Sequence, residues 1–437
     1  MRIDKLHIKN FRGYDDLEID LFSNFNLIIG DNGSGKTALL EALTVAMGSF
    51  LLGIRNSYSK GIIRGDIRIA TFEFSEEYQF PVEINALGSI DGHTLKWQRS
   101  LNGFKKRTTT TNSKRIRNYA EMLENSISIG ENLKLPLLAY YATGRLFDEA
   151  KDKKTIAAED HKTTLSSRFR AYERCLEAKS THKQFQNWFK AKEISRIQKR
   201  TDDIALRIVQ DAVINNLPNC KNFYFEFDPD KPQGLKVELE DGRVLPFSSL
   251  SDGTRNFFAL MSDIAYKATT LNPHLKERAL LETEGIVLID ELDLHLHPEW
   301  QKRIVDSLKN TFPKIQFICT THSPFIIQAT EENELLIIKD NKIRENVSGA
   351  NLSIEDIAEI HQKVENPQWS KKREDLYKLA PLYYNAVKSN TLTTELKEQF
   401  EEAVKPFAMD TALFSVIEEE KIIAEYLRNK SNNESGR

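Results

Sequence analysis

The chain has 437 residues, 40% of them hydrophobic, and a formal net charge of −3. This length and apolar content suffice for a large buried core, and the balanced charge excludes a uniformly basic nucleic-acid-binding protein. The three cysteines lie far apart and predict neither a disulfide framework nor a zinc site. No apolar stretch approaches the roughly 18 residues of a membrane span, so we expect a cytoplasmic protein without a membrane partner.

Residues 1–145 are expected to form the N-terminal lobe of an α/β domain. Residues 3–9 and 25–29 predict strands, and the second is apolar almost throughout, which is typical of a buried central strand. Short alternating segments between residues 65 and 100, bounded by Gly and Asp, predict an antiparallel β-lobe beside it.

Residues 104–118 form a basic run without an acidic residue, around four consecutive threonines. We expect an exposed loop there. Such a run is a candidate contact for DNA phosphates, but it is equally the pattern of an ordinary solvated surface. The candidate DNA-binding residues are Lys105, Lys106, Arg107, Lys114, Arg115 and Arg117.

The remaining chain divides into three predicted parts. Residues 146–220 are charged and helical in pattern, which indicates a helical insertion. Residues 221–348 form a C-terminal lobe whose apolar strands alternate with helices, as in a parallel sheet. Residues 349–437 are expected to be a helical tail with acidic patches, which are either contacts for a partner or an oligomer, or simply solvated surface.

The segment 30–37, GDNGSGKT, matches the pattern G-x-x-x-x-G-K-[ST] between a predicted strand and an apolar-faced helix. In this context the pattern predicts a phosphate-binding loop for ATP and Mg²⁺, because glycines let backbone N–H groups turn toward phosphates. Lys36 is expected to reach the β- and γ-phosphates, and the Thr37 hydroxyl to bind magnesium. The predicted nucleotide-binding residues here are Gly30, Asn32, Gly33, Ser34, Gly35, Lys36, Thr37 and Ala38.

Two carboxylates end the apolar strand predicted at residues 285–289. Asp290 is placed to hold the magnesium ion, and Glu291 to act as the general base that deprotonates water. A further strand, residues 315–319, is followed by His322, which is expected to contact the γ-phosphate from an adjacent strand end. Lys36, Glu291 and His322 are therefore the predicted catalytic residues, and Thr37 and Asp290 the predicted metal ligands.

The segment 250–255, LSDGTR, precedes a predicted helix and is called the signature segment below. Ser251 and Gly253 at a helix start suit anion binding, although a simple Ser N-cap fits the same residues. Its place between the phosphate loop and the acidic strand resembles the ABC ATPases of the SMC and RecF kind, whose element is Leu-Ser-Gly-Gly-Gln. In that family the bound phosphate belongs to a second subunit, so the resemblance implies an ATP-sandwich homodimer.

The resemblance implies an α/β fold: an ABC-type ATPase head with a mixed sheet and helices, an antiparallel β-lobe, a helical insertion and a helical C-terminal tail. It also implies that Arg12, within NFRG, braces phosphates and that Asp293 lies in a loop crossing to the opposing site. The Gln that the family places after the strand at 137–143 is missing; Tyr141 and Arg145 occupy that region.

A different chemistry is conceivable just beyond the acidic strand. His295 and His297, with Glu299 nearby, have the spacing of a metal-ligand group. Pro298 at a helix start favours a structural role for this segment instead.

The spacing between the phosphate loop and the signature segment is too short for the long coiled coil of SMC proteins, and the tail lacks the acidic pattern of a Toprim nuclease. The chain thus resembles the ATPase subunit of Septu-type anti-phage systems, PtuA. This implies a homo-oligomer, a dimer or larger, whose nucleotide state regulates a separate HNH nuclease acting on DNA. The alternatives are a RecF-like repair ATPase acting directly on DNA, a transporter subunit, and a slow nucleotide-gated sensor.

Overall fold

The computed structural model describes residues 1–55, 57–146, 168–177, 182–331, 333–344, 352–360 and 362–435. The chain forms two compact units, Met1–Ile357 and Ala358–Arg437. Most of the first half of the predicted helical insertion lies outside the described residues.

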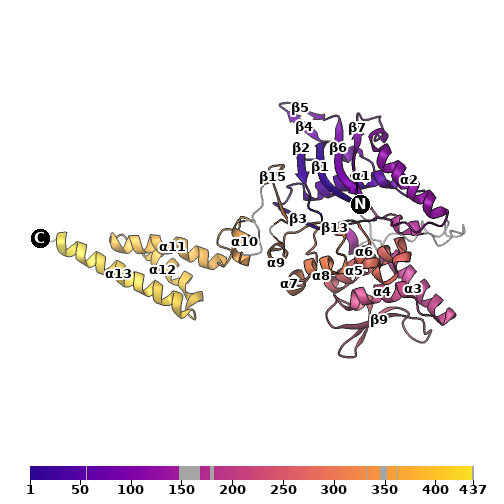
Figure 1. Cartoon of the computed structure of the whole chain (residues 1–437). Helices are drawn as coiled ribbons and strands as arrows, with labels where there is room; N and C mark the ends of the chain where they lie inside the picture. The colour runs from indigo at the N-terminus through magenta and orange to yellow at the C-terminus, as the bar shows by residue number, and fades with distance from the viewer. Residues whose placement is uncertain are drawn as a thin grey trace. The chain divides into compact units, whose positions relative to one another are not determined.

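A six-stranded sheet of order β15-β14-β3-β13-β12-β8 lies at the centre of the first unit (Figure 1). Its strands are β3 (Phe25–Gly30), β8 (Leu137–Tyr141), β12 (Gly285–Ile289), β13 (Ile315–Thr320), β14 (Leu335–Lys339) and β15 (Lys342–Arg344). All neighbours are parallel except β14 and β15. Strands β8, β12 and β13 are buried at every position, as their apolar sequences predict. The carboxyl ends of β3, β13 and β12 therefore meet at one edge of the sheet.

The expected antiparallel β-lobe is present as a four-stranded sheet of order β2-β1-β6-β7. Its strands are β1 (Arg2–Phe11), β2 (Tyr14–Asp20), β6 (Val82–Ile90) and β7 (His93–Leu101). A hairpin of β4 (Ile69–Phe72) and β5 (Ser75–Tyr78) accompanies it, and β9 (Cys220–Glu226), β10 (Gly234–Leu239) and β11 (Val244–Pro246) form a third antiparallel sheet. Alternating burial along β6 matches the period of two expected for a half-covered sheet.

Helix α1, which follows the phosphate loop, is buried along almost its whole length. The helices of the first unit are α1 (Lys36–Leu51), α2 (Lys114–Ser128), α3 (His182–Lys199), α4 (Ile204–Ile214), α5 (Asp252–Leu271), α6 (Ala279–Glu282), α7 (Pro298–Gln301), α8 (Ile304–Thr311) and α9 (Pro324–Gln328). A further helix, α10 (Ile354–Ile360), spans the boundary between the two units.

The basic run does not form one loop through residue 118, as expected, because helix α2 begins at Lys114. Ile116, Ala120 and Leu123 recur at helical spacing and are buried. This apolar stripe stabilises a helix whose other face carries the basic residues. The loop therefore ends at residue 113.

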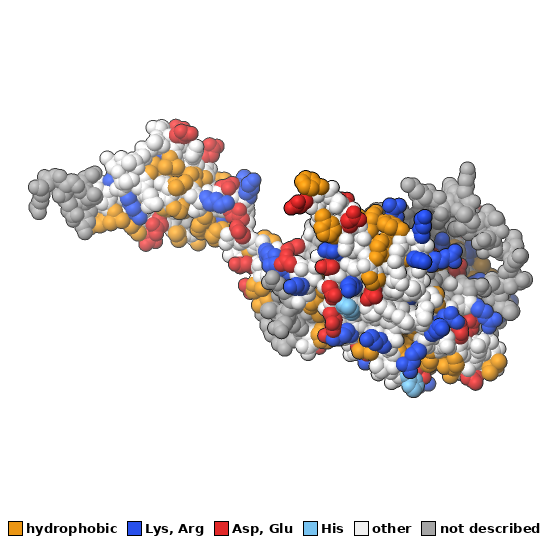
Figure 2. Space-filling view, turned by 90° about the horizontal axis from the view of Figure 1, so that it is seen from above, with side chains coloured by type: hydrophobic (Ala, Val, Ile, Leu, Met, Phe, Trp, Pro, Cys, Tyr) orange, Lys and Arg blue, Asp and Glu red, His pale blue; other side chains and the backbone are white. Residues whose placement is uncertain are grey.

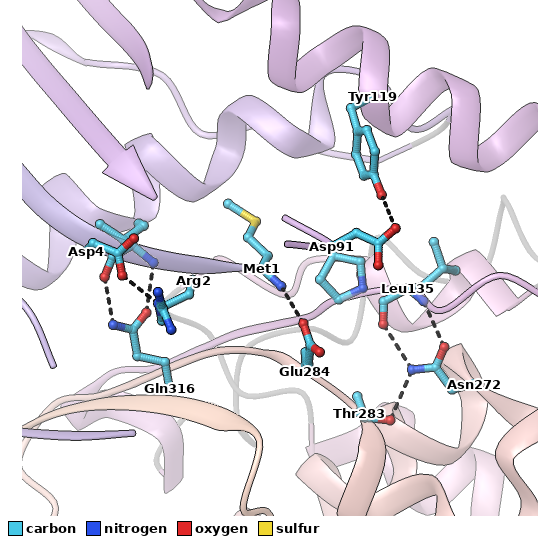
Figure 3. A network of polar contacts seen from close by, with 12 residues as sticks. Met1, Arg2, Asp4, Asp91, Tyr119, Leu135, Asn272, Thr283, Glu284 and Gln316 are labelled. Atoms are coloured by element: carbon cyan, nitrogen blue, oxygen red, sulfur yellow. Dashed lines mark hydrogen bonds and ion pairs between the residues drawn. The ribbon is translucent and has the colours of Figure 1, made fainter. Parts of the chain in front are cut away.

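Polar contacts join the β-lobe to the central sheet near the N-terminus (Figure 3). The amino group of Met1 forms an ion pair with Glu284 at 3.6 Å, and burial lowers the pKa of that amino group. The Gln316 side chain, on β13, accepts from the backbone N–H of Ile3 at 2.9 Å and donates to its carbonyl at 2.7 Å. Asn272 donates from one amide nitrogen to both the Leu135 carbonyl and the Thr283 hydroxyl. The two hydrogen bonds between Gln316 and Ile3 therefore hold β13 against β1.

The second unit contains α11 (Lys371–Lys388), α12 (Thr394–Val404) and α13 (Thr411–Ser435), as the helical pattern of the tail predicts. Its core is small and includes Leu376, Tyr383, Phe400 and Ile417, with the rings of Tyr383 and Phe400 stacked 4.1 Å apart. Across the described parts of both units, no helix has the length and apolarity needed to cross a membrane.

Candidate nucleotide-binding site

At two positions of the phosphate loop, Gly30 and Gly35, there is no room for the Cβ atom of any other residue. Gly35 has φ +98°, and a Cβ there would lie 2.5 Å from the Tyr14 hydroxyl. A Cβ on Gly30 would lie 2.5 Å from the carbonyl oxygen of Ile338. The loop is thus held between β2 and β14, directly before the start of α1.

Lys36 places its ammonium group inside this loop. Its Nζ donates to the carbonyls of Gly30 at 2.8 Å and Asp31 at 3.1 Å. Burial lowers the pKa of Lys36, and the carboxylates of Asp290, Asp31 and Glu291 oppose that effect. A partly desolvated cation held by carbonyls at a helix start is an arrangement that favours an incoming anion.

Asp290 lies between two threonine hydroxyls from different elements. Thr37, at the start of α1, donates to Oδ2 at 2.9 Å, and Thr320, at the end of β13, donates to Oδ1 at 2.6 Å. The two predicted metal ligands are therefore in direct contact. Sequence reasoning missed Thr320, although its place at a strand end two residues before His322 was a usable signal.

Several features of the loop fit a triphosphate with its magnesium ion. The Ser34 hydroxyl is buried and has no hydrogen-bond partner in the described part of the chain, so it is available to a phosphate oxygen. The described residues contain no group of three or more His, Cys, Asp and Glu side chains able to hold a metal. Magnesium at Thr37 and Asp290 would thus take further oxygens from phosphates and water, as is usual for this ion.

Glu291 and His322 leave neighbouring strand ends on the same edge of the sheet. Glu291 has φ +51°, and its backbone N–H donates to the Thr320 hydroxyl at 2.8 Å. Asp293 accepts at Oδ1 from the Thr321 hydroxyl at 2.5 Å and from the His322 N–H at 3.3 Å. The left-handed backbone at Glu291 is stabilised by these contacts and turns the chain away from the strand direction.

The signature segment packs against the loop that follows Glu291. Ser251 caps α5 and accepts from the Thr254 N–H at 3.2 Å, as the N-cap interpretation predicts. A Cβ on Gly253 would lie 2.2 Å from the His295 carbonyl, and Asn256 donates to the Leu294 carbonyl at 2.8 Å. Within the described residues no hydrogen bond links Ser251 to the phosphate loop of its own chain.

The histidine that follows this loop has a structural role. His297 Nδ1 accepts from the backbone N–H of Glu299 at 3.3 Å and so caps α7. This contact supports the structural interpretation over a metal-ligand group.

Arg12 lies in the tight turn between β1 and β2, with φ +49°. Its Nε donates to the buried Asp66 carboxylate at 2.8 Å, and its backbone N–H donates to the Asp66 carbonyl at 2.7 Å. Lys60 lies near Asp66 and forms an ion pair with Glu41 of α1. Burial lowers the pKa of Lys60 to about 8, and the negative charge of Asp66 opposes this shift. Sequence patterns pointed to neither Asp66 nor Lys60, because neither belongs to a motif.

Tyr141, near the position of the family's missing Gln, is engaged elsewhere. Its hydroxyl donates to Asp263 Oδ2 at 2.7 Å, and Asp263 forms a buried ion pair with Lys267 on the same helix, α5. The side chain of Arg145 lies outside the described residues. The last residue of β8 is thus hydrogen-bonded to α5, the helix that begins at the signature segment.

The six predicted DNA-binding residues fall into two groups. Lys105, Lys106 and Arg107 are exposed on the loop after β7, whereas the other three lie on α2, where Arg117 pairs with Glu121 at 3.0 Å. Their contact with DNA stays a prediction.

The chain is similar to several known proteins. Residues 25–328 match the model of the family described as "AAA domain, putative AbiEii toxin, Type IV TA system". The chain is 26% identical to "Retron Ec83 probable ATPase" of Escherichia coli, over 85% of this chain and 78% of that protein. It is 26% identical to "Septu protein PtuA" of Bacillus thuringiensis, over 77% and 75%. The structure of an SMC head bound to the C-winged helix domain of ScpA matches with a TM-score of 0.47 and 18% identity, over 80% of this chain and 98% of that one.

Proposed function

Since the chain belongs to the AAA-domain family whose model it matches, and is an ATPase, we propose that it is the ATP-hydrolysing subunit of a bacterial anti-phage defence complex. The observation that carries the ATPase chemistry is the contact of Asp290 with both Thr37 and Thr320, beside Lys36. Resemblance to Septu and retron proteins over three quarters of the chain or more supports the place in defence.

Each residue of the site has a role that its position supports. Lys36 and the loop N–H groups bind the β- and γ-phosphates, and Thr37 and Asp290 hold Mg²⁺. Glu291 orients and deprotonates the attacking water, and His322 contacts the γ-phosphate. Magnesium, when bound, supplies charge neutralisation between the phosphates.

We further propose that two copies sandwich the nucleotide and that the nucleotide state regulates a separate HNH nuclease acting on DNA. Ser251 is exposed at the start of α5, as a group that completes a neighbour's site must be. The packing of Gly253 on the His295 carbonyl supports a route by which changes at Glu291 shift the start of α5. Close packing of this kind is rigid enough to transmit small displacements.

Coexpression with the products of the adjacent genes, followed by sizing and a nuclease assay, tests the proposal. The wild type is compared with Lys36→Ala, which should not bind ATP, and Glu291→Gln, which should retain it. The proposal expects a nuclease to copurify and its DNA cleavage to differ between the two variants. A chain that purifies without a nuclease, and whose ATP turnover DNA alone stimulates, would instead be a RecF-like repair ATPase. Equal cleavage with both variants would exclude regulation by nucleotide state.

A further inference from the structure

A cavity in the β-lobe is lined by residues that are not among those of the nucleotide-binding site. The cavity, of about 400 Å³, lies between the segment before β4 and the loop after β7. Its lining includes Ile62, Arg64, Phe104, Lys106, Arg107 and Thr108. Its volume falls within the range of roughly 300–1,000 Å³ that is usual for small-ligand sites, and the ATP chemistry described above uses none of its residues.

The two walls of this cavity are fastened to each other. The Thr108 hydroxyl accepts from the backbone N–H of Ile62 at 2.9 Å and lies 3.2 Å from the Ile62 carbonyl. Thr109 extends this attachment, because its N–H donates to the Ser100 carbonyl at 2.7 Å. The basic loop is therefore held in place before any ligand arrives, which lowers the entropic cost of binding.

The rim of the cavity is positively charged. Arg64, Lys106 and Arg107 are exposed, and the lining contains no carboxylate. None of the three forms an ion pair with a carboxylate of the described residues. Three cations around one concavity attract an anion and focus the field into it.

An aromatic ring at the same rim supplies a stacking surface. Phe104 is 51% exposed and meets Tyr78 and Phe80 in edge-to-face contacts, at centroid distances of 4.5 and 5.4 Å. The Arg64 guanidinium lies over the Phe104 ring at 5.2 Å and over the Tyr78 ring at 5.6 Å. These contacts orient the ring and the cation together, which is how proteins combine base stacking with phosphate binding.

We propose that this cavity binds single-stranded nucleic acid, one nucleotide placing its base against Phe104 and its phosphate among Arg64, Lys106 and Arg107. A strand is favoured over a free nucleotide because the apolar surface continues beyond the cavity. Tyr78 belongs to the β4–β5 hairpin, whose tip exposes Phe72 by 56% and Phe74 by 99%. In Figure 2, which looks down on the β4–β5 side of the first unit, hydrophobic side chains lie next to both basic and acidic ones. This site does not depend on the proposed function, because it shares no residue with the ATP site.

Binding of labelled oligothymidylate to the full-length protein, measured by fluorescence anisotropy at several salt concentrations, tests the proposal. Phe104→Ala should weaken binding about tenfold, as expected from the loss of one stacked base, and Phe104→Trp should retain it. The double variant R64Q/R107Q should lower the slope of log affinity against log salt by about 0.7, because the one phosphate held in the cavity loses two of its three cations. Matched controls are Phe414→Ala and Arg243→Gln, an exposed ring in the second unit and an exposed arginine outside the cavity.

Three results would overturn the proposal. Binding unchanged in Phe104→Ala and in R64Q/R107Q would place the strand elsewhere. Thymidine monophosphate that competes as well as the oligonucleotide would make this a free-nucleotide site. If duplex DNA bound as tightly as the single strand, both to the wild type and to Phe104→Ala, the surface would bind phosphates only and no base would stack on the ring. Basal ATP turnover and thermal unfolding, measured for every variant, separate loss of binding from loss of fold.

Discussion

The hydroxyl of Thr320 donates a hydrogen bond to Oδ1 of Asp290 at 2.6 Å. The same hydroxyl accepts from the backbone N–H of Glu291 at 2.8 Å. One side chain at the end of β13 therefore orients the predicted magnesium ligand and supports the left-handed backbone of the predicted general base. Because β13 lies next to β12, these contacts fix the end of β13 against the two carboxylate residues that follow β12.

Thr320→Val should lower both stability and turnover. Valine keeps the volume of threonine but removes both hydrogen bonds, and a buried polar group that loses its partner costs about 1–3 kcal/mol. Urea denaturation measures the stability, and steady-state ATPase kinetics measure kcat. Thr320→Ser retains the hydroxyl and should recover most of the turnover. Full activity in the valine variant would show that the contact has no catalytic importance.

Glu291→Gln should bind ATP and hydrolyse it at least about a hundredfold more slowly, which is the usual contribution of a general base. Lys36→Ala should lose binding itself, because the loop is then without its ammonium group. Binding of a fluorescent ATP analogue and single-turnover hydrolysis distinguish the two effects. If Glu291→Gln turned over at the wild-type rate, another group would have to activate the water.

Gly253→Ala should destabilise the signature segment. The new Cβ would lie 2.2 Å from the His295 carbonyl oxygen, and the obstacle is backbone, so either α5 or the loop after Glu291 must move. Overpacking of this kind costs about 1–3 kcal/mol. Thermal unfolding measures the loss. Gly242→Ala is the control for a glycine with open space around it, although its positive φ adds a strain of its own.

Asp263→Asn should be among the most destabilising single changes. Asp263 and Lys267 are both almost fully buried, and the Tyr141 hydroxyl donates to the same carboxylate. Removing one partner of a buried ion pair typically costs about 3–5 kcal/mol, because the other charge stays buried without compensation. The double variant D263L/K267M removes both charges and should recover much of the loss in a urea titration. A double variant no more stable than the single one would contradict this account.

The parts of the site that could be predicted from sequence are those in which local spacing determines the geometry. A glycine-rich turn between a buried strand and a helix allows few backbone conformations, so the place of Lys36 and Thr37 follows from the segment alone. Asp290 was similarly predictable, because the end of an apolar strand in a parallel sheet faces the edge where ligands bind.

Contacts between distant segments were not predictable in this way. Asp66 stands in no motif, yet it is buried and holds Arg12. Asp263 is an ordinary helix residue by sequence, and only the packing of α5 against β8 brings it to Tyr141. The loop expected through residue 118 was wrong because the six basic residues concealed the apolar stripe that stabilises α2.

Mixing two inactive variants tests the shared site directly. A Lys36→Ala protomer has a defective phosphate loop and an intact signature segment, whereas a Ser251→Arg protomer has the opposite defect. If the nucleotide is sandwiched, a dimer of one of each contains one complete site. Random exchange makes half of the dimers mixed, each with one working site of two, so turnover should recover to about a quarter of the wild-type value.

The control mixture is Lys36→Ala with Glu291→Gln. Both residues act from the same side of the sandwich, so each site in a mixed dimer keeps one defect and no recovery is expected. Recovery only with Ser251→Arg would locate Ser251 in the partner's site, because no arrangement within a single chain can complement Lys36→Ala. A Ser251→Arg variant that is fully active alone, or a first mixture that stays inactive although sizing shows exchange, would exclude this form of the sandwich.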